Sequence, residues 1–187
     1  MAAKQSKEMG EIFEADHNYE DALMAYQQAA DLHQSDNSPA AASGNLVKIA
    51  TILSQHVDPP DFGRAAQVYE QLGRSCMEKK LLQANAKAYW LQAGLCLLAL
   101  EDTVAAHEKL RTFQDVDYGF EDSRECKFLE KLITAVEGFD AEGFAQTCFE
   151  WDSISKLDAW KTSVLLRIKK SIEGGVGGDG DADVDLT

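Results

Sequence analysis

Apolar residues recur along most of this chain three and four positions apart, and the strict alternation typical of strands is absent. The spacing is clearest in four stretches: Leu46, Ile49, Ala50 and Leu53; Ala65, Val68, Tyr69 and Leu72; Leu129, Leu132, Ile133 and Val136; and Ala141, Phe144, Ala145 and Cys148. Such spacing places one apolar stripe along a helix, and a stripe of this width must pack against a neighbour. The pattern therefore predicts an all-helical protein.

Polar residues that favour helix starts agree with these stretches. Asn18 with Asp21, and Asp122 with Glu125, have the spacing of an N-cap side chain followed three positions later by an acidic residue. The adjacent prolines at 59–60 break the chain between two helices. We expect about nine helices with short connections, as in stacks of antiparallel neighbours.

The helices also repeat in pairs with a shared pattern. A small residue is followed by an aromatic four positions later and by an apolar residue three positions after that, at Ala22, Tyr26 and Ala29 and again at Ala65, Tyr69 and Leu72. A weaker copy reads Ala106, Leu110 and Phe113. These offsets resemble tetratricopeptide repeats. They predict a right-handed α-solenoid of antiparallel helix pairs that ends in a small helical bundle.

The chain has 187 residues, of which 45% are hydrophobic, and this is ordinary for a globular protein. Its formal net charge of −14 argues against nucleic-acid binding, which needs a basic surface. The longest apolar run, residues 95–100, is too short to span a bilayer, and residues 1–10 contain no signal region. The cysteines are widely spaced, which favours reduced thiols in a cytosolic protein.

No catalytic or metal-binding arrangement emerges, and no cofactor is implied. The four histidines lack HExxH spacing and an obvious nucleophile. The three tryptophans are most simply packing residues. Residues 173–187 form a glycine-rich and aspartate-rich acidic tail, expected to be flexible and separate from the helical domain of residues 1–172. Its alternating aspartates resemble calcium ligands, but no glutamate follows to complete such a loop.

Several longer segments resemble one protein family. Asp122 to Leu129 and Trp151 to Lys170 are similar to segments of α-type soluble NSF attachment proteins (SNAPs), and residues 68–73 and 81–89 match in order and spacing. The resemblance covers about Lys4 to Ile172 and resumes at the ending Asp-Leu-Thr, which is similar to plant and green-algal members. Several ordered matches of this length are far more specific than a helical repeat alone.

The resemblance implies an adaptor without catalytic activity that coats a four-helix SNARE bundle, syntaxin-type SNAREs included, and presents it to the NSF ATPase. The basic SNARE-facing positions of the family correspond to Lys4, Lys48, Lys87 and Arg124, whereas one family lysine corresponds to Gly44. The NSF-facing acids and terminal leucine correspond to Glu137, Asp183, Asp185 and Leu186. The resemblance also implies a cytoplasmic protein that associates peripherally with membranes through SNAREs.

Two departures from the family bear on this expectation. The further N-terminal helix pairs of the family, with their membrane-touching loop, have no counterpart in the sequence, so we expect weakened membrane contact. A glycine-rich tail replaces a more helical acidic ending. Two other readings stay open: a generic tetratricopeptide cochaperone, which would need its basic residues gathered in one groove, and a small hydrolase, for which no base is evident.

Overall fold

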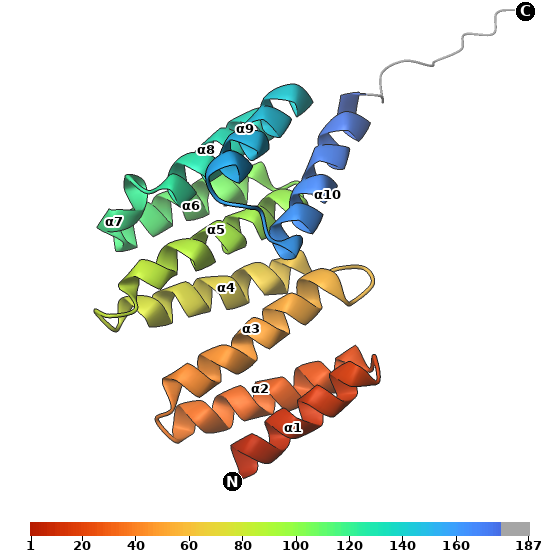
Figure 1. The fold of residues 1–187 in the computed structure, drawn as a ribbon, viewed down its shortest axis with the longest axis vertical. Helices are drawn as coiled ribbons and strands as arrows, with labels where there is room; N and C mark the ends of the chain where they lie inside the picture. Colours follow the sequence, from red (N-terminus) through yellow and green to blue (C-terminus); the bar gives the residue numbers. More distant parts are fainter. Residues whose placement is uncertain (177–187) are drawn as a thin grey trace, which may run out of the picture. The chain divides into compact units, whose positions relative to one another are not determined.

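The computed structural model describes residues 1–176, and these contain ten α-helices and no strand (Figure 1). The helices are α1 (Ala2–Ala15), α2 (Tyr19–Ser35), α3 (Pro39–Gln55), α4 (Phe62–Met77), α5 (Gln83–Ala99), α6 (Thr103–Val116), α7 (Tyr118–Glu121), α8 (Arg124–Glu137), α9 (Ala141–Ile154) and α10 (Ala159–Val176). The prediction of an all-helical fold is confirmed. About nine helices were expected from the sequence. The additional helix is α7, a single turn too short to show apolar residues at helical spacing.

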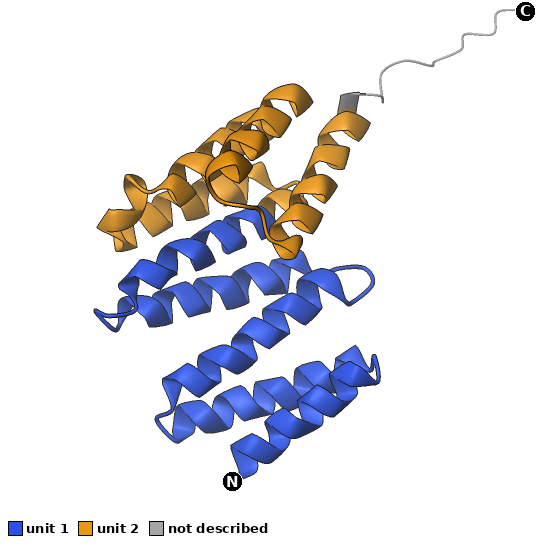
Figure 2. Cartoon of the chain, viewed as in Figure 1, with its two compact units in different colours: residues 1–96 blue, residues 97–187 orange. Residues whose placement is uncertain are grey.

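The chain divides into two compact units, residues 1–96 and residues 97–187 (Figure 2). In the first unit consecutive helices lie side by side, α1 on α2, α2 on α3 and α3 on α4. In the second unit α6 packs on α7 and α8, α8 packs on α9, and α9 packs on α10. Each unit is thus built from neighbours in sequence, as expected when short loops join antiparallel helices.

Close helix approach in the first unit depends on small residues, as the repeat pattern predicts. The repeated residues are all buried: Ala22, Tyr26, Ala29, Ala65, Tyr69 and Leu72. A Cβ built at Gly10 would lie 2.9 Å from the ring of Tyr26, and one built at Gly73 would overlap the ring of Trp90. The glycines therefore let an aromatic ring of the neighbouring helix lie directly against the backbone.

Four helices end in the same turn, and none of these turns has glycine at its positive-φ position. The residue after the C-cap has a positive φ of 51–61° at His17, Asn37, Glu101 and Phe139. The following amide bonds back five residues, as where Asp140 donates to the carbonyl of Ala135 at 2.8 Å. This is a Schellman motif, in which the last helical carbonyls are satisfied by the turn itself.

The residue that completes this turn also starts the next helix. The side chain of Asn18 accepts a hydrogen bond from the amide of Asp21, so the expected cap of α2 is confirmed. The second expected cap is wrong by one residue, because Ser123, not Asp122, caps α8 by accepting from the amide of Cys126 at 3.1 Å. Asp122 is instead the C-cap of α7 and has a helical backbone conformation. The next residue, Ser123, has the extended conformation typical of an N-cap.

The helical part also runs further than the sequence pattern indicates. The predicted boundary was Ile172, whereas α10 continues to Val176. Lys169 and Glu173 form an i, i+4 ion pair at 3.5 Å across this last turn. Glycine is weakly helix-forming but is tolerated in a terminal turn, so the two glycines at 174–175 do not end the helix at once.

Opposite effects are expected from the same substitution at two glycines of the first unit. Gly73→Ala should lower the free energy of unfolding by about 1–3 kcal/mol, because the added methyl group overlaps the ring of Trp90. Gly44→Ala should raise it by about 0.5–1 kcal/mol, because Gly44 is exposed in α3 and a Cβ there meets nothing within 4 Å. Urea unfolding of both variants tests this. Equal effects at the two sites would contradict the packing role of Gly73.

Candidate functional site

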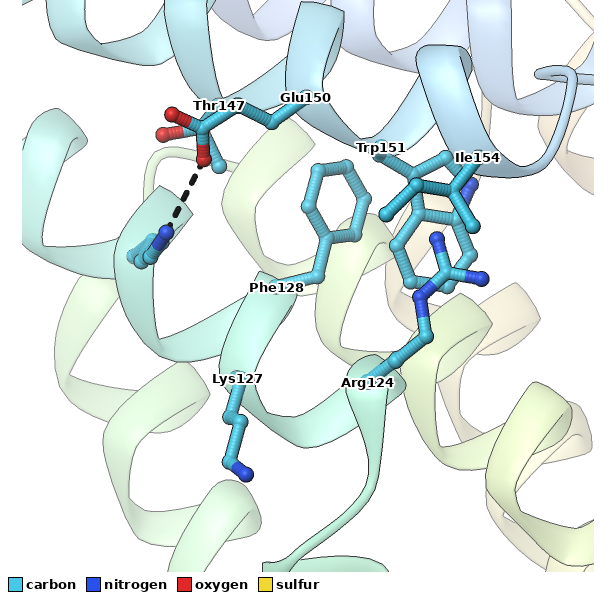
Figure 3. Close-up of a pocket in the computed structure, with 8 residues that line it drawn as sticks. Arg124, Lys127, Phe128, Thr147, Glu150, Trp151 and Ile154 are labelled. Atoms are coloured by element: carbon cyan, nitrogen blue, oxygen red, sulfur yellow. Dashed lines mark hydrogen bonds and ion pairs between the residues drawn. The ribbon is translucent and has the colours of Figure 1, made fainter.

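A shallow groove runs between α8 and α9 in the second unit (Figure 3). It is lined by Arg124, Lys127, Phe128, Lys131, Thr147, Glu150, Trp151 and Ile154. The four α8 residues follow i, i+3, i+4, i+7 spacing, so the helix presents them on one face. Serine capping at the preceding position fixes where α8 begins and hence which face carries Arg124.

Aromatic rings form the floor of this groove and hold its arginine in place. The rings of Phe128 and Trp151 stack with centroids 4.6 Å apart. The guanidinium carbon of Arg124 lies 4.4 Å from the Trp151 ring centroid, and its Nη1 donates to Ser155 Oγ at 3.1 Å. Because the guanidinium is already oriented, less side-chain entropy is lost when it binds an anion.

The charges in the groove have a positive balance in an acidic protein. Arg124, Lys127 and Lys131 face a single carboxylate, that of Glu150, within the groove. Lys131 Nζ lies 3.0 Å from Glu150, and this hydrogen bond is the main cause that holds the pKa of Glu150 below its ordinary value. None of the ion pairs found within residues 1–176 involves Lys127 or Arg124. The groove is therefore suited to an acidic ligand that also has apolar groups.

The described side chains that could hold a metal ion are scattered, and two of the described thiols have raised pKa values. Within residues 1–176 no three histidine, cysteine, aspartate or glutamate side chains are placed to hold a metal ion. Burial raises the pKa of Cys126 to about 11 and that of Cys148 to about 11. Both residues are therefore protonated thiols at neutral pH and poor nucleophiles.

Sequence reasoning found Arg124 but missed the rest of the groove. Trp151 packs between helices as expected, since it stacks on Phe128 of α8, but it is only half-buried and also lies under the arginine (Figure 3). Lys127 and Lys131 were not singled out. The spacing of the basic residues along α8 could have indicated a common face, but their pairing with α9 is visible only in the structure.

Lys4 and Lys48, two expected SNARE-facing lysines, lie in the first unit and already have acidic partners. Lys4 is exposed on α1 and lies 3.7 Å from Glu8 of the same helix. Lys48 of α3 donates to both carboxylate oxygens of Glu14 in α1, at 3.0 and 3.1 Å. Lys48 thus links α3 to α1 through an ion pair as well as adding charge to the surface.

Glu14 joins three helices of the first unit. Besides its bonds from Lys48, it accepts a hydrogen bond of 2.6 Å from the hydroxyl of Tyr26 in α2. Burial opposes the ionisation of Glu14, but the hydrogen bonds from Tyr26 and Lys48 outweigh burial and hold its pKa below the ordinary value. Burial, followed by the bond to Glu14, raises the pKa of Tyr26. The carboxylate is therefore charged and the phenol neutral at physiological pH.

The remaining expected positions are placed as follows. Lys87 of α5 is half-buried in the first unit, and none of the ion pairs found within residues 1–176 includes it. Glu137, the last residue of α8, lies 3.1 Å from Nε2 of His107 in α6. Asp183, Asp185 and Leu186 lie outside the described residues. Within the described part of the chain, no helix is both long and apolar enough to cross a bilayer.

The consecutive packing of helices within each unit defines this molecule as a helical-repeat protein. The family model for soluble NSF attachment protein, SNAP, matches residues 1–173. The chain therefore belongs to the soluble NSF attachment protein family, as its sequence segments indicated.

Curated relatives agree with the family model. The α-soluble NSF attachment protein of Dictyostelium discoideum is 36% identical over 172 residues, which are 92% of this chain and 58% of that protein. The α-protein of Vitis vinifera is 37% identical over 92% of this chain and 59% of its own length. The β-soluble NSF attachment protein of Bos taurus is 38% identical over 97% of this chain and 60% of its own length. The chain thus spans about three fifths of the length of the relatives it matches.

Removal of the Glu14 charge tests the tie between α1 and α3. Glu14→Gln should lower the free energy of unfolding at pH 7 by about 1 kcal/mol, since the pair is partly exposed. The folded pKa of Glu14 is depressed, so its contribution is complete above the unfolded carboxyl pKa of about 4.3 and is lost as the pH falls below that value. Unfolding measured from pH 7 to pH 3 should show the variant converging on the wild type. A difference that persists unchanged at pH 3 would contradict this assignment.

Proposed function

We propose that this chain is an adaptor that binds SNARE four-helix bundles and recruits the NSF ATPase, which disassembles them during vesicle fusion. The observation that supports the proposal most is membership of the SNAP family across residues 1–173. The relatives are named as NSF attachment proteins. The proposal assigns the role of these full-length relatives to a chain that spans about three fifths of their length.

The SNARE-facing contacts are assigned to Lys4, Lys48, Lys87 and Arg124. SNARE bundles present acidic surfaces, and attraction by separated cations gives fast and salt-sensitive binding that tolerates sequence differences among syntaxin-type partners. Each exposed pair contributes only about 0–1 kcal/mol, so useful affinity needs several contacts and several copies. Arg124 supports this role best, because it is exposed and already oriented by Trp151.

The NSF-facing contacts are assigned to Glu137, Asp183, Asp185 and Leu186. Acidic groups suit basic pockets on the ATPase, and the leucine adds a small apolar anchor. Glu137 is exposed at the end of α8 and lies 3.1 Å from Nε2 of His107.

The adaptor has no catalytic activity of its own and needs no cofactor. We further propose that the protein works in the cytoplasm and meets membranes peripherally, through the SNAREs that it holds. A tetratricopeptide cochaperone would need its basic residues gathered in one groove. Of the four expected cations only Arg124 lines the groove between α8 and α9, and the family match favours the SNAP role.

Charge reversal of Lys87 and Arg124 together should weaken SNARE binding at least tenfold while leaving the helical content unchanged. Lys48 is left intact because its reversal would also place two carboxylates against each other at Glu14. The measurement is capture of SNARE bundles and of NSF by the immobilised chain, with heat-shock tail peptides as an alternative ligand. Lys80→Glu, at an exposed lysine that none of the ion pairs found within residues 1–176 includes, is the control. Wild-type SNARE capture by the double variant, or preferential capture of heat-shock peptides, would refute the proposal.

A gain of affinity is expected where the family lysine is replaced by glycine. Gly44 lies one helical turn before Lys48 on α3, and a side chain there meets no neighbour within 4 Å. Gly44→Lys should raise the affinity for SNARE bundles about two- to fivefold at low salt, corresponding to one exposed ion pair. Gly44→Gln controls for the gain in helix propensity and should not alter binding. An equal effect of both substitutions would remove this position from the interface.

A further inference from the structure

We propose that the acidic segment 177–187 docks in cis on the groove between α8 and α9 and thereby masks it. The groove is the one lined by Arg124, Phe128, Trp151 and their neighbours. The proposal that this contact competes with an acidic partner rests on the proposed function, whereas the docking itself does not. Three properties of the groove and the segment support it: charge, pattern and reach.

The charges of the two surfaces are complementary. The segment contributes Asp179, Asp181, Asp183 and Asp185 and contains no basic residue. The groove contributes three cations and one carboxylate, and the single carboxylate already pairs with Lys131. Lys127 and Arg124 therefore remain as cations that the described residues do not neutralise. A groove of this kind attracts an acidic segment that is tethered close by.

The pattern of the segment fits the two sides of the groove. Acidic residues alternate with Ala182, Val184 and Leu186, so an extended backbone would place the acids on one side and the apolar side chains on the other. The groove is divided in the same way. Its cations all come from α8, while Trp151 and Ile154 come from α9 (Figure 3). Ile154 has 72% of its surface exposed and is available for such a contact.

The segment also leaves the helical part at a suitable place. A Cβ built at Gly175 of α10 would lie 3.1 Å from Phe139, in the loop that joins α8 to α9. At 1.5 Å per residue, Lys131 lies about 12 Å along α8 from this loop and Arg124 about 22 Å. Ten extended residues reach about 33 Å, so residues 177–186 can follow the groove along its whole length.

Short tethering makes even a weak contact effective. A connection of a few residues gives an effective concentration on the order of 1 mM. A segment that binds the groove with a dissociation constant of about 1 mM would then occupy it about half of the time. The apparent affinity for a competing acidic ligand would fall by about twofold, and more if the segment binds more tightly.

The decisive experiment compares the full chain with a variant in which the four tail aspartates are changed to asparagine. The indole N–H signal of Trp151 is followed by ¹H–¹⁵N NMR. It should shift in the variant, and 0.5 M NaCl should move the wild-type signal in the same direction, because exposed pairs are screened. The buried indole of Trp90 should remain unchanged and thus report an intact fold.

A synthetic peptide of residues 177–187 serves as the probe ligand. It should bind the asparagine variant at least twofold more tightly than it binds the wild type, and Lys127→Glu should abolish both the binding and the difference. Identical Trp151 signals in wild type and asparagine variant would overturn the proposal. A difference between wild type and asparagine variant that persists after Lys127→Glu would also overturn it, because the segment would then bind elsewhere. A difference that grows with protein concentration would overturn it too, because the segment would then bind a second copy of the chain. None of these readouts uses SNAREs or NSF, so failure of the adaptor role would leave the result interpretable.

Discussion

Most of this structure follows from the need to bury one apolar stripe on each helix. The smallest residue on a stripe sets how closely the neighbouring helix can approach. Where the backbone carries glycine, as at Gly10 and Gly73, an aromatic ring from the next helix packs directly against it. Tyr26 and Trp90 are fully buried in this way. Because each helix can cover only its neighbour's stripe, the chain has to stack, and its exposed faces are left for binding.

Periodicity and the repeat pattern predicted all the long helices and most of the buried residues, because both depend on local spacing. Five residues of the expected stripes are only partly buried: Val68, Val136, Ala141, Ala145 and Cys148. Ala65, Tyr69 and Leu72 were placed in the core from their offsets alone, and they are buried. The helix ends were harder to predict. A glycine normally signals a C-terminal turn, but Glu101 and Phe139 adopt positive φ without being glycine. The energy of those turns comes from backbone hydrogen bonds, and the side chains give no indication of them.

The candidate site was only partly predictable for a related reason. Arg124 was found through family resemblance, yet its orientation depends on Trp151, which lies in another helix of the pair. Lys48 was expected as a SNARE-facing cation, and its ion pair with Glu14 was not foreseen because Glu14 is 34 positions away in sequence. Helical spacing describes one helix at a time, so contacts that pair two or three helices are invisible to it. Charges that the sequence treats as separate are therefore already combined in the folded chain.

The contact between Glu14 and Lys48 also affects how the first unit opens. In a simple helical stack each helix touches only its neighbours, so an end helix can fray alone. Here α1 is bonded through Glu14 to both α2 and α3. Opening α1 must therefore break bonds to two other helices, so its amide protons should exchange with solvent more slowly than those of a helix bound to one neighbour. A stack built from local contacts thereby gains a contact between helices that are not consecutive.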